Sequence, residues 1–282
     1  MQILPSLLRA ETQLHLLTCL LHRDLSDQRH KTNTHAHYYI QYPSVDTAVC
    51  EEDMISEVHQ QSHGHHSSYK NASFFSLSPG STQLFEPKDP RLHKPMSVSQ
   101  YLQRKLRWMT LGGQYDWTKK VYPAESPQAF PEDIAELLAG IFPDMKAQAA
   151  IVNLYTPGDT LSVHRDVSED CDRGLVSISL GCDGIFIVGT QVEGDAGNSN
   201  IEYVVLRLRS GDAVYMSGPA RFAWHGVPQV IGGTCPDWLC AWPAESAPNG
   251  NIATNDSRAY ESWRGWMATK RVNLNVRQIM TD

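Results

Sequence analysis

The sequence lacks any apolar run long enough to span a membrane. A transmembrane helix needs about 20 consecutive apolar residues, and no such stretch occurs among these 282 residues. The apolar stretch Leu14–Leu21 lies near the N-terminus, but it follows Glu11 and has no small-residue cleavage site, so we do not interpret it as a signal peptide. We predict instead a first buried helix over Ala10–His22, and we expect no membrane partner.

Cysteine motifs of the CxxC type are also absent. The six cysteines are scattered along the chain, at Cys19, Cys50, Cys171, Cys182, Cys235 and Cys240. In a chain of this length without a secretory signal, buried and reduced thiols are the expected state. A disulfide or a metal site at Cys235 and Cys240 is the less favoured alternative.

An excess of basic residues is absent too. Lys and Arg number 24 against 31 Asp and Glu, which gives a formal net charge of −7. A protein that packages nucleic acid would be basic, so this class is disfavoured. An enzyme that contacts nucleic acid briefly needs only a local basic patch, and that class stays open.

The chain contains no internal repeat, and its composition divides it into three parts. Residues 1–45 are predicted to form an N-terminal strand and helix that support the main domain. Residues 46–96 are rich in serine, proline and histidine and are predicted to be a flexible insertion. The cluster His63–His66 within it is interpreted as solvated loop rather than as a metal site. Residues 97–282 are predicted to form the main domain.

In the main domain, two helices precede a region of short strands. Helical spacing predicts helices over Val98–Leu106 and Pro131–Ile141, and it places Trp263 and Trp266 in the core. Extended segments are predicted at Trp108–Leu111, Ala150–Tyr155, Leu161–Asp166, Leu175–Leu180, Ile185–Val188, Tyr203–Leu208, Ala213–Met216 and Val272–Val276. This pattern indicates an α+β fold with a double-stranded β-helix (jelly roll) core, whose N-terminal helices pack on one sheet.

Polar residues recur at a spacing of two along several predicted strands. His164 and Asp166 show this spacing, as do Asn153 and Tyr155. Residues two apart in a strand point to the same side of the sheet, so each strand presents several polar groups on one face. If that face is buried, its polar groups need one another, a metal or a ligand as partners.

The residues His164, Asp166 and the distant His225 fit the facial triad of two histidines and one carboxylate that holds Fe(II). Such a triad leaves the opposite coordination positions free for a chelating co-substrate and O2. An HxD pair alone is a weak signal because it occurs often by chance, but its combination with a distant histidine and a later Arg-rich strand is strong. The alternatives are a core histidine at His225 and a surface residue at His164, and we favour the metal site over both.

Two arginines on the last predicted strand, Arg271 and Arg277, indicate the co-substrate. A dicarboxylate such as 2-oxoglutarate needs a cation at each end, and arginine binds a carboxylate with a two-pronged fork. On a straight strand the two arginines lie roughly 20 Å apart, which suits opposite ends of one dicarboxylate better than a single carboxylate. An exposed strand face is the alternative, because Val272, Leu274 and Val276 form the other, apolar face.

Six motifs follow one another along the chain. They are Asn153-Leu-Tyr155-x-Pro157-Gly158, Leu161-x-x-His164-x-Asp166-x-Ser168-Glu169, Val176-Ser-Ile-Ser-Leu-Gly181, Ser210-Gly-Asp212, Arg221-x-x-x-His225-Gly226 and Arg271-x-Asn273-Leu-x-x-Arg277-Gln278. Together they resemble the AlkB family of nucleic-acid demethylases, in the family's order and over roughly residues 105–281. The chain looks most like the eukaryotic, in particular fungal, type-one AlkB homologues at Lys105–Gly112 and at Ser168-Glu169.

The resemblance implies a role for most polar residues of these motifs. Fe(II) is expected to be bound by His164, Asp166 and His225. 2-Oxoglutarate is expected to contact Asn153, Tyr155, Arg271, Asn273 and Arg277, with its distal carboxylate on Arg271 and its iron-side carboxylate near Arg277. With O2, such an enzyme oxidises an N-methyl group while 2-oxoglutarate becomes succinate and CO2, and the product releases formaldehyde and the free base.

Residues 105–122 interleave basic and aromatic side chains, a combination that binds phosphates and stacks bases. In AlkB-like proteins this region forms the nucleotide-recognition lid. The expected substrate contacts are Tyr115, Trp117, Lys119, Lys120 and Ser168, whereas Trp108 and Tyr122 are expected in the core. Bacterial-type members have an acidic residue at the position of Ser168, so the resemblance puts a DNA-repair substrate in doubt and favours the type-one group.

These observations predict an Fe(II)- and 2-oxoglutarate-dependent oxidative demethylase of N-methylated nucleobases, with methyladenine in tRNA or mRNA favoured over DNA. Two alternatives remain open: a 2-oxoglutarate-dependent hydroxylase or demethylase of a protein or small molecule, and a non-catalytic metal-binding interaction protein. The intact triad and both arginines argue against the last. We expect a monomer that acts inside the cell, in the cytoplasm or nucleus, with the mitochondrion left open.

Overall fold

The structure is a computed structural model that describes residues 1–43, 73–123, 128–193, 199–244 and 260–281. Cys50 and the cluster His63–His66 lie outside these ranges. Among the described helices, none is long and apolar enough to cross a membrane.

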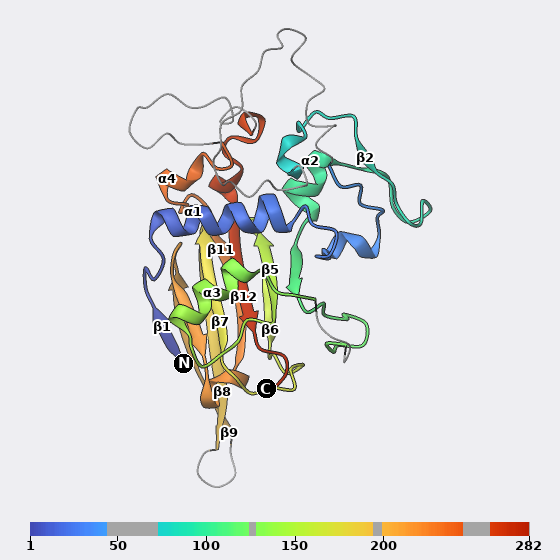
Figure 1. Cartoon of the computed structure of the whole chain (residues 1–282). Helices are drawn as coiled ribbons and strands as arrows, with labels where there is room; N and C mark the ends of the chain where they lie inside the picture. Colours follow the sequence, from blue (N-terminus) through green and yellow to red (C-terminus); the bar gives the residue numbers. More distant parts are fainter. Residues whose placement is uncertain (44–72, 124–127, 194–198, 245–259, 282) are drawn as a thin grey trace.

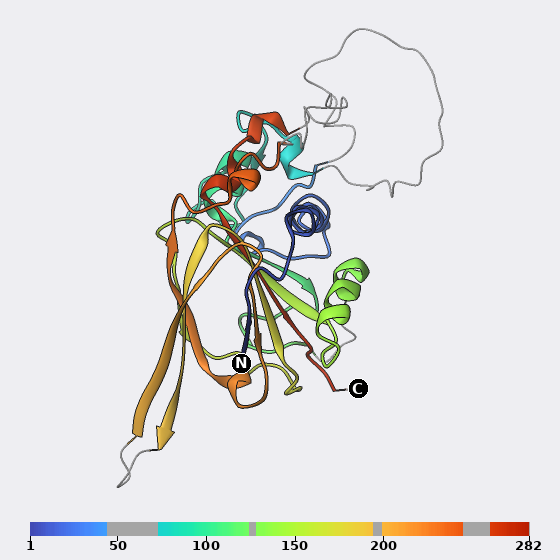
Figure 2. The ribbon, with the colours of Figure 1, turned by 90° about the vertical axis from the view of Figure 1, so that its left-hand side faces the viewer.

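Two antiparallel sheets form the centre of the molecule and lie as two layers (Figure 2). The larger sheet has the strand order β1 (Gln2–Leu4), β10 (Ala213–Met216), β7 (Leu175–Gly181), β12 (Arg271–Arg277), β5 (Ala149–Tyr155) and β4 (Trp108–Gly112). The smaller sheet has the order β6 (Leu161–His164), β11 (Trp224–Ile231), β8 (Asp183–Glu193) and β9 (Ser199–Leu208). Because the chain passes repeatedly from one sheet to the other, residues distant in sequence meet between them.

Two helices cover the outer face of the larger sheet, away from the smaller one (Figures 1 and 2). One is α1 (Ala10–Thr18), which continues directly into the π-helical segment η1 (Cys19–Asp24), and the other is α3 (Glu132–Ile141). The leucines at 16, 17, 20 and 21 are at most 2% exposed, so one side of α1 and η1 is packed in the core. The buried helix predicted over Ala10–His22 is therefore present and extends to Asp24.

Shorter elements complete the described part of the chain. They are η2 (Asn33–Ala36), η4 (Phe74–Ser76), β2 (Leu84–Phe85), β3 (Met96–Ser97), α2 (Val98–Gln100), η5 (Tyr101–Lys105), η7 (Gly218–Phe222), α4 (Asp237–Cys240), η9 (Glu261–Trp263) and η10 (Trp266–Thr269). The helix predicted over Val98–Leu106 thus consists of α2 and η5. Trp263 and Trp266 are buried as predicted, and their indole N–H groups donate to the backbone carbonyls of Leu77 and Leu102.

Several side chains of residues 73–96 are packed in the core, although the sequence predicted an insertion over 46–96. Phe74, Phe75 and Phe85 are fully buried, and the ring of Phe75 lies 5.2 Å from that of Trp266. Aromatic packing therefore outweighs the serine- and proline-rich composition in this stretch. The rest of the predicted insertion lies outside the described residues, and the division of the chain into three parts stays a prediction.

The alternation predicted along β12 is confirmed. Val272, Leu274 and Val276 are fully buried on the helix-covered face, while Arg271 and Asn273 are on the face that turns toward the smaller sheet. In the register of β12 with β5, Arg271 pairs with Tyr155 and Asn273 with Asn153. The polar faces of the two strands therefore coincide.

The strand β11, which contains His225, was not predicted. Its sequence includes Pro228, which cannot donate a hydrogen bond and is rare within a strand. In the structure the pairing of β11 with β8 shifts register between Gly226 and Gln229, and its pairing with β6 shifts between His225 and Val227. The proline lies at this irregularity, where no regular pairing is needed.

Candidate active site

A cavity of about 340 Å³ lies between the two sheets. It is lined by most of the residues that the sequence singled out, namely Tyr115, Trp117, Asn153, Tyr155, His164, Asp166, Ser168, His225, Arg271, Asn273 and Arg277. Lys119 and Lys120 do not line it. The structure thus brings the predicted triad and the predicted co-substrate residues into one space.

The three triad residues converge at one end of this cavity. Nε2 of His164 lies 3.9 Å from one carboxylate oxygen of Asp166, and Nε2 of His225 lies 3.7 Å from the other. His164 and His225 face each other across the paired strands β6 and β11. A set of one ligand atom from each residue lies within 4.8 Å of one another, as the ligands of one metal ion must.

The backbone fixes both imidazole rings in the orientation that a metal ligand needs. Nδ1 of His164 lies 2.8 Å from the carbonyl of Ser162, and Nδ1 of His225 lies 3.1 Å from that of Ala223. A proton held at Nδ1 leaves the lone pair of Nε2 free toward the cavity. Burial also lowers the pKa of His225 below its ordinary value despite the nearby Asp166, so this imidazole is neutral at neutral pH.

The carboxylate of Asp166 is held by a buried network that continues away from the metal position. Burial raises the pKa of Asp166, but Arg277, His225 and His164 together bring it below its ordinary value. Nη1 of Arg277 lies 3.5 Å from Asp166 and 3.0 Å from the carboxylate of Glu169. Arg221 donates to Glu169 at 2.9 Å and to the backbone carbonyl of Asp166 at 2.8 Å. Asp166 is therefore ionised and fixed in place.

Arg271 lies at the other end of the cavity in a different environment. It is 1% exposed, and its guanidinium donates to two neutral groups, the hydroxyl of Ser179 at 2.9 Å and the carbonyl of Cys182 at 3.4 Å. Burial lowers its pKa below the ordinary value. Among the described residues, neither Nε of Arg271 nor the hydroxyl of Tyr155 has a hydrogen-bond partner. Two buried donors without acceptors in one cavity fit a carboxylate ligand.

A model of the 2OG-Fe(II) oxygenase superfamily matches residues 70–277 of the chain. The "N6-methyladenosine RNA demethylase ALKB1" of Pyricularia oryzae is 50% identical over 98% of this chain and 73% of its own length. The "N6-methyladenosine RNA demethylase ALKBH" of Cryphonectria parasitica is 50% identical over 87% of this chain and 98% of its own length. The chain belongs to the AlkB family of 2OG-Fe(II) oxygenases.

One further relative agrees with this membership of the AlkB family, and one solved structure shares the fold. The "tRNA demethylase abh1" of Schizosaccharomyces pombe is 35% identical over 98% of this chain and 78% of its own length. The solved structure of OsALKBH1 covers 98% of this chain and 95% of its own, with a TM-score of 0.50 and 16% identity, and it supports the fold alone. As a member of this family, the protein is a dioxygenase that depends on Fe(II), 2-oxoglutarate and O2.

In this AlkB-family chain, aromatic residues of the segment 113–123 stand at the mouth of the cavity. The ring of Trp117 lies 4.7 Å from that of Trp108 and 4.8 Å from that of Tyr115, and its side chain is 47% exposed. The hydroxyl of Tyr115 lies 3.1 Å from that of Ser168. Trp108 and Tyr122 were expected in the core, but both are half-buried. Trp108 lies on β4, an edge strand with a neighbouring strand on one side only, and Tyr122 lies outside the sheets.

The two lysines of the predicted lid lie farther out. Lys119 and Lys120 occupy a turn closed by the bridge between Asp116 and Val121, and both are exposed. Nζ of Lys119 lies 3.9 Å from the carboxylate of Asp116. These lysines contact no group of the iron or 2-oxoglutarate positions in the described residues, so only a longer ligand than a single base reaches them.

Sequence reasoning assigned no role to Glu169, Arg221 or Asn275, although all three support the site. The side chains of Glu169 and Arg221 are 1% and 0% exposed, and Nδ2 of Asn275 lies 3.4 Å from Asp166. The spacing of two along β12 placed Asn275 on the correct face. No sequence signal identifies Glu169 as the partner of both Arg221 and Arg277, because the three residues come from separate segments.

Proposed function

We propose that this chain is an oxidative demethylase of N-methylated nucleobases and that it prefers methyladenine in single-stranded or loop RNA over DNA. The observation that carries this proposal is the meeting of three features in one cavity: the triad, the unpartnered donors of Arg271 and Tyr155, and the aromatic edge of Tyr115 and Trp117. The relatives described as RNA and tRNA demethylases support the preference for RNA.

In this proposal the residues near Arg271 hold 2-oxoglutarate. Arg271 takes the distal carboxylate with its fork, the Tyr155 hydroxyl donates to it, and Asn153 lines the same position. Asn273 supports the site rather than binding 2-oxoglutarate itself. Its Nδ2 already donates to the hydroxyl of Ser177 at 2.8 Å and to the carbonyl of Ile178 at 3.1 Å. Arg271 and the triad line the same cavity, so a dicarboxylate held by Arg271 would lie in the cavity that also contains the triad.

At the other end, His164, Asp166 and His225 hold the iron, and Arg277 stands beside the iron-side carboxylate of the co-substrate. When bound, Fe(II), 2-oxoglutarate and O2 supply the oxidation of an N-methyl group, and the hydroxymethyl product separates into formaldehyde and the free base. Arg277 favours the ionised form of Asp166, and Glu169 holds Arg277 in place. At this end Asp166 and His225 are largely buried, whereas the side chain of His164 is 35% exposed.

The aromatic edge receives the base. Tyr115 and Trp117 offer flat faces on which a flipped or unpaired base stacks, at about 1–3 kcal/mol per base. A base in a duplex must first be unstacked and unpaired at a cost of a few kcal/mol, so we expect paired substrates to react worse. Ser168, which is hydrogen-bonded to Tyr115, lines the cavity next to this proposed base position. A Ser168→Asp variant is expected to alter base preference without affecting iron loading.

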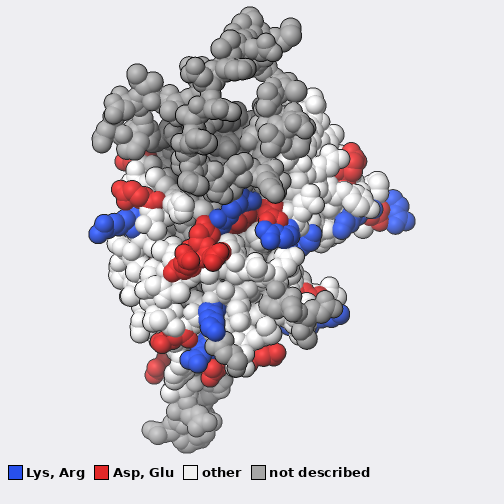
Figure 3. Space-filling model, viewed as in Figure 1, with Lys and Arg blue, Asp and Glu red and all other residues white. Residues whose placement is uncertain are grey.

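The proposal extends to the architecture and the place of action. The repeated passage of the chain between two antiparallel sheets supports a double-stranded β-helix (jelly roll) over residues 97–282, with residues 1–45 as its support. On the face drawn in Figure 3, which carries α1 and α3, basic and acidic side chains interleave without one continuous basic field. Nucleic acid is therefore expected to bind locally at the cavity mouth. We infer action inside the cell, where methylated RNA occurs.

The test is methyl loss measured by mass spectrometry on matched oligonucleotides. The purified protein with Fe(II), 2-oxoglutarate and O2 is given N-methyladenine in single-stranded RNA, single-stranded DNA and duplex DNA of one sequence. We expect loss of the methyl group with formaldehyde and succinate, fastest on single-stranded RNA. Rapid succinate formation with a protein or metabolite extract, but with no methylated oligonucleotide, would instead support a hydroxylase of another substrate class.

A further inference from the structure

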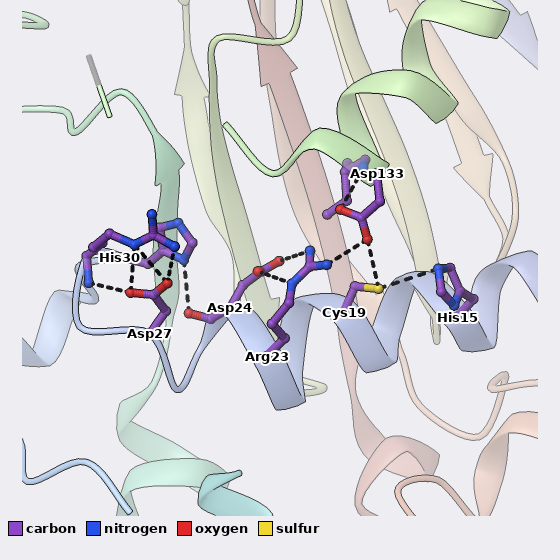
Figure 4. A network of polar contacts seen from close by, with 9 residues as sticks. His15, Cys19, Arg23, Asp24, Asp27, His30 and Asp133 are labelled. Atoms are coloured by element: carbon purple, nitrogen blue, oxygen red, sulfur yellow. Dashed lines mark hydrogen bonds and ion pairs between the residues drawn. The ribbon is translucent and has the colours of Figure 1, made fainter. Parts of the chain in front are cut away.

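A second group of metal-binding side chains lies on the outer face of the larger sheet, where α1, η1 and α3 meet. His15 belongs to α1, Cys19 begins η1 four residues later, and Asp133 comes from the first turn of α3. Figure 4 shows the sulfur of Cys19 in contact with His15 on one side and with Asp133 on the other. The catalytic triad lies on the opposite side of this sheet, between the two sheets, so the two groups are separate.

The distances within this second group suit a tetrahedral metal. Sγ of Cys19 lies 3.6 Å from Nε2 of His15 and 3.3 Å from Oδ2 of Asp133, and the three ligand atoms all lie within 4.8 Å of one another. Zinc–sulfur bonds of about 2.3 Å and zinc–nitrogen or zinc–oxygen bonds of about 2.0–2.2 Å place tetrahedral neighbours roughly 3.5 Å apart. The two distances from Cys19 thus match those between ligands of one metal ion, and the third, between His15 and Asp133, is at most 4.8 Å.

The surrounding charges also suit a divalent cation. Oδ2 of Asp133 accepts from Arg23 at 2.6 Å, and Arg23 is paired in turn with Asp24 at 2.6 Å. With the thiol deprotonated, Cys19, Asp24 and Asp133 supply three negative charges and Arg23 one positive charge, which leaves a net charge of −2. Arg23 uses one lone pair of the Asp133 oxygen and leaves the other for a metal. A bound divalent ion therefore neutralises the group.

We propose that His15, Cys19 and Asp133 form a second metal site, distinct from the iron site, that binds Zn²⁺ or a similar borderline transition metal. Thiolate, imidazole and carboxylate together select such ions over Mg²⁺ or Ca²⁺. The metal replaces the proton that the Cys19 thiol donates to Asp133 in the metal-free protein, so binding releases one proton. In the described residues the group has three members, and because His15 is exposed the fourth position goes to water. The ion joins η1 to α3 over the core.

Cobalt substitution tests the proposal without any measurement of activity. Co²⁺ bound to a thiolate gives a near-ultraviolet charge-transfer band, which Co²⁺ at the iron triad cannot give because that site has no sulfur ligand. The full-length protein is titrated with Co²⁺, and then with Zn²⁺ in competition. We expect a thiolate band whose intensity corresponds to one thiolate-bound ion per chain, which is complete by two added ions because the triad also takes Co²⁺, and which Zn²⁺ displaces. Absence of this band would overturn the proposal.

Variants assign the band to its residues. Cys19→Ser is expected to abolish it, and His15→Ala, an exposed position that the fold tolerates, is expected to weaken it at equal Co²⁺. The matched controls are Cys240→Ser and Cys50→Ser, which remove other thiols and are expected to keep the band. Zn²⁺ should also raise the Tm of the wild type more than that of Cys19→Ser. A band that survives in Cys19→Ser, or one that disappears in Cys240→Ser, would contradict the proposal.

Discussion

The two ends of β12 present the same side chain in opposite electrostatic situations. At one end, Arg277 is ion-paired with Asp166 and Glu169, and these anions together with Tyr122 raise its pKa although burial alone would lower it. At the other end, Arg271 is just as buried but donates only to neutral groups, and its pKa is lowered. The protein thus pairs one buried arginine with carboxylates of its own, whereas the other has no ion pair among the described residues.

This difference in ion pairing indicates different roles for the two arginines: one supports the structure of the site, and the other binds a ligand. Burying a charge without a partner costs several kcal/mol, so an unpaired buried arginine persists where a ligand supplies the missing charge. Arg277, Glu169 and Arg221 form a network of ion pairs within the chain, although Nε and Nη2 of Arg277 have no hydrogen-bond partner among the described residues. Arg271 and Tyr155 form a network that is complete only with a carboxylate. We therefore assign the first to support of Asp166 and the second to binding of the distal carboxylate of 2-oxoglutarate.

The largest loss of activity is expected from a change at Asp166, which contacts both Arg277 and the metal position. Asp166→Ala removes the only carboxylate of the triad, so iron binding and all conversion of 2-oxoglutarate should be lost. The fold should survive, because Glu169 still pairs with both Arg221 and Arg277. Metal analysis, succinate formation and far-ultraviolet circular dichroism measure the three results. His164→Ala is expected to behave in the same way, and succinate formation at the wild-type rate in either variant would exclude this triad.

The second largest effect is expected on the KM for 2-oxoglutarate, when Arg271 is replaced. Arg271→Ala removes a charge-assisted fork worth roughly 1.5–3 kcal/mol, so the KM for 2-oxoglutarate should rise by about 10- to 150-fold. The KM for nucleic acid and the Tm should change little, because in the described residues the arginine donates only to neutral groups. Steady-state kinetics with each substrate varied in turn separates the two constants. Arg271→Lys, which keeps the charge but not the fork, should lie between; an unchanged KM for 2-oxoglutarate would refute the role.

At the Arg277 end of β12, a change in the ion-pair network should lower the stability of the protein rather than its affinity for 2-oxoglutarate. Glu169→Gln leaves Arg221 and Arg277 buried with too little negative charge, and the free energy of unfolding should fall by about 3–5 kcal/mol. Urea denaturation measures it. The control is Glu261→Gln, which breaks the exposed pair with Arg264 and should leave stability unchanged. If both variants changed the free energy of unfolding equally, the buried network would stabilise the protein no more than an exposed ion pair does.

The smallest effect is expected on RNA binding, when the exposed lysines Lys119 and Lys120 are replaced. The networks described at the two ends of β12 do not include these residues. Lys119→Ala with Lys120→Ala should weaken binding of single-stranded RNA and reduce the slope of log K against log salt by about 1.4, since each phosphate contact contributes about 0.7. Conversion of 2-oxoglutarate without RNA should persist because the cavity is intact. Arg29→Ala with Arg91→Ala removes the same charge from exposed positions outside the lid. If this control lowers the slope equally, the lysines have no specific role.

Much of the cavity could be predicted from local periodicity. The spacing of two along β5 and β12 placed Asn153, Tyr155 and Arg271 on one face, and the apolar residues between them fixed which face is covered by helices. The HxD pair and the distant histidine gave the triad, although Pro228 concealed the strand on which His225 lies. The family resemblance then supplied roles that spacing alone left open.

What the sequence could not supply are the contacts between distant segments. The buried pairs of Glu169 with Arg221 and Arg277 join three parts of the chain, and no periodicity encodes such partners. The same holds for Cys19 and Asp133, which are 114 residues apart and meet through the packing of two helices. The aromatic residues Phe74 and Phe75 were hidden in a segment whose composition resembles a loop.

Binding of 2-oxoglutarate, measured by calorimetry without O2, tests most directly whether the unpartnered arginine is the co-substrate site. Wild type, Arg271→Ala and Glu169→Gln are loaded with the same divalent metal and titrated with 2-oxoglutarate. We predict a Kd raised by about 10- to 150-fold in Arg271→Ala and a much smaller change in Glu169→Gln. Equal affinity of wild type and Arg271→Ala would contradict the assignment of the two ends of β12.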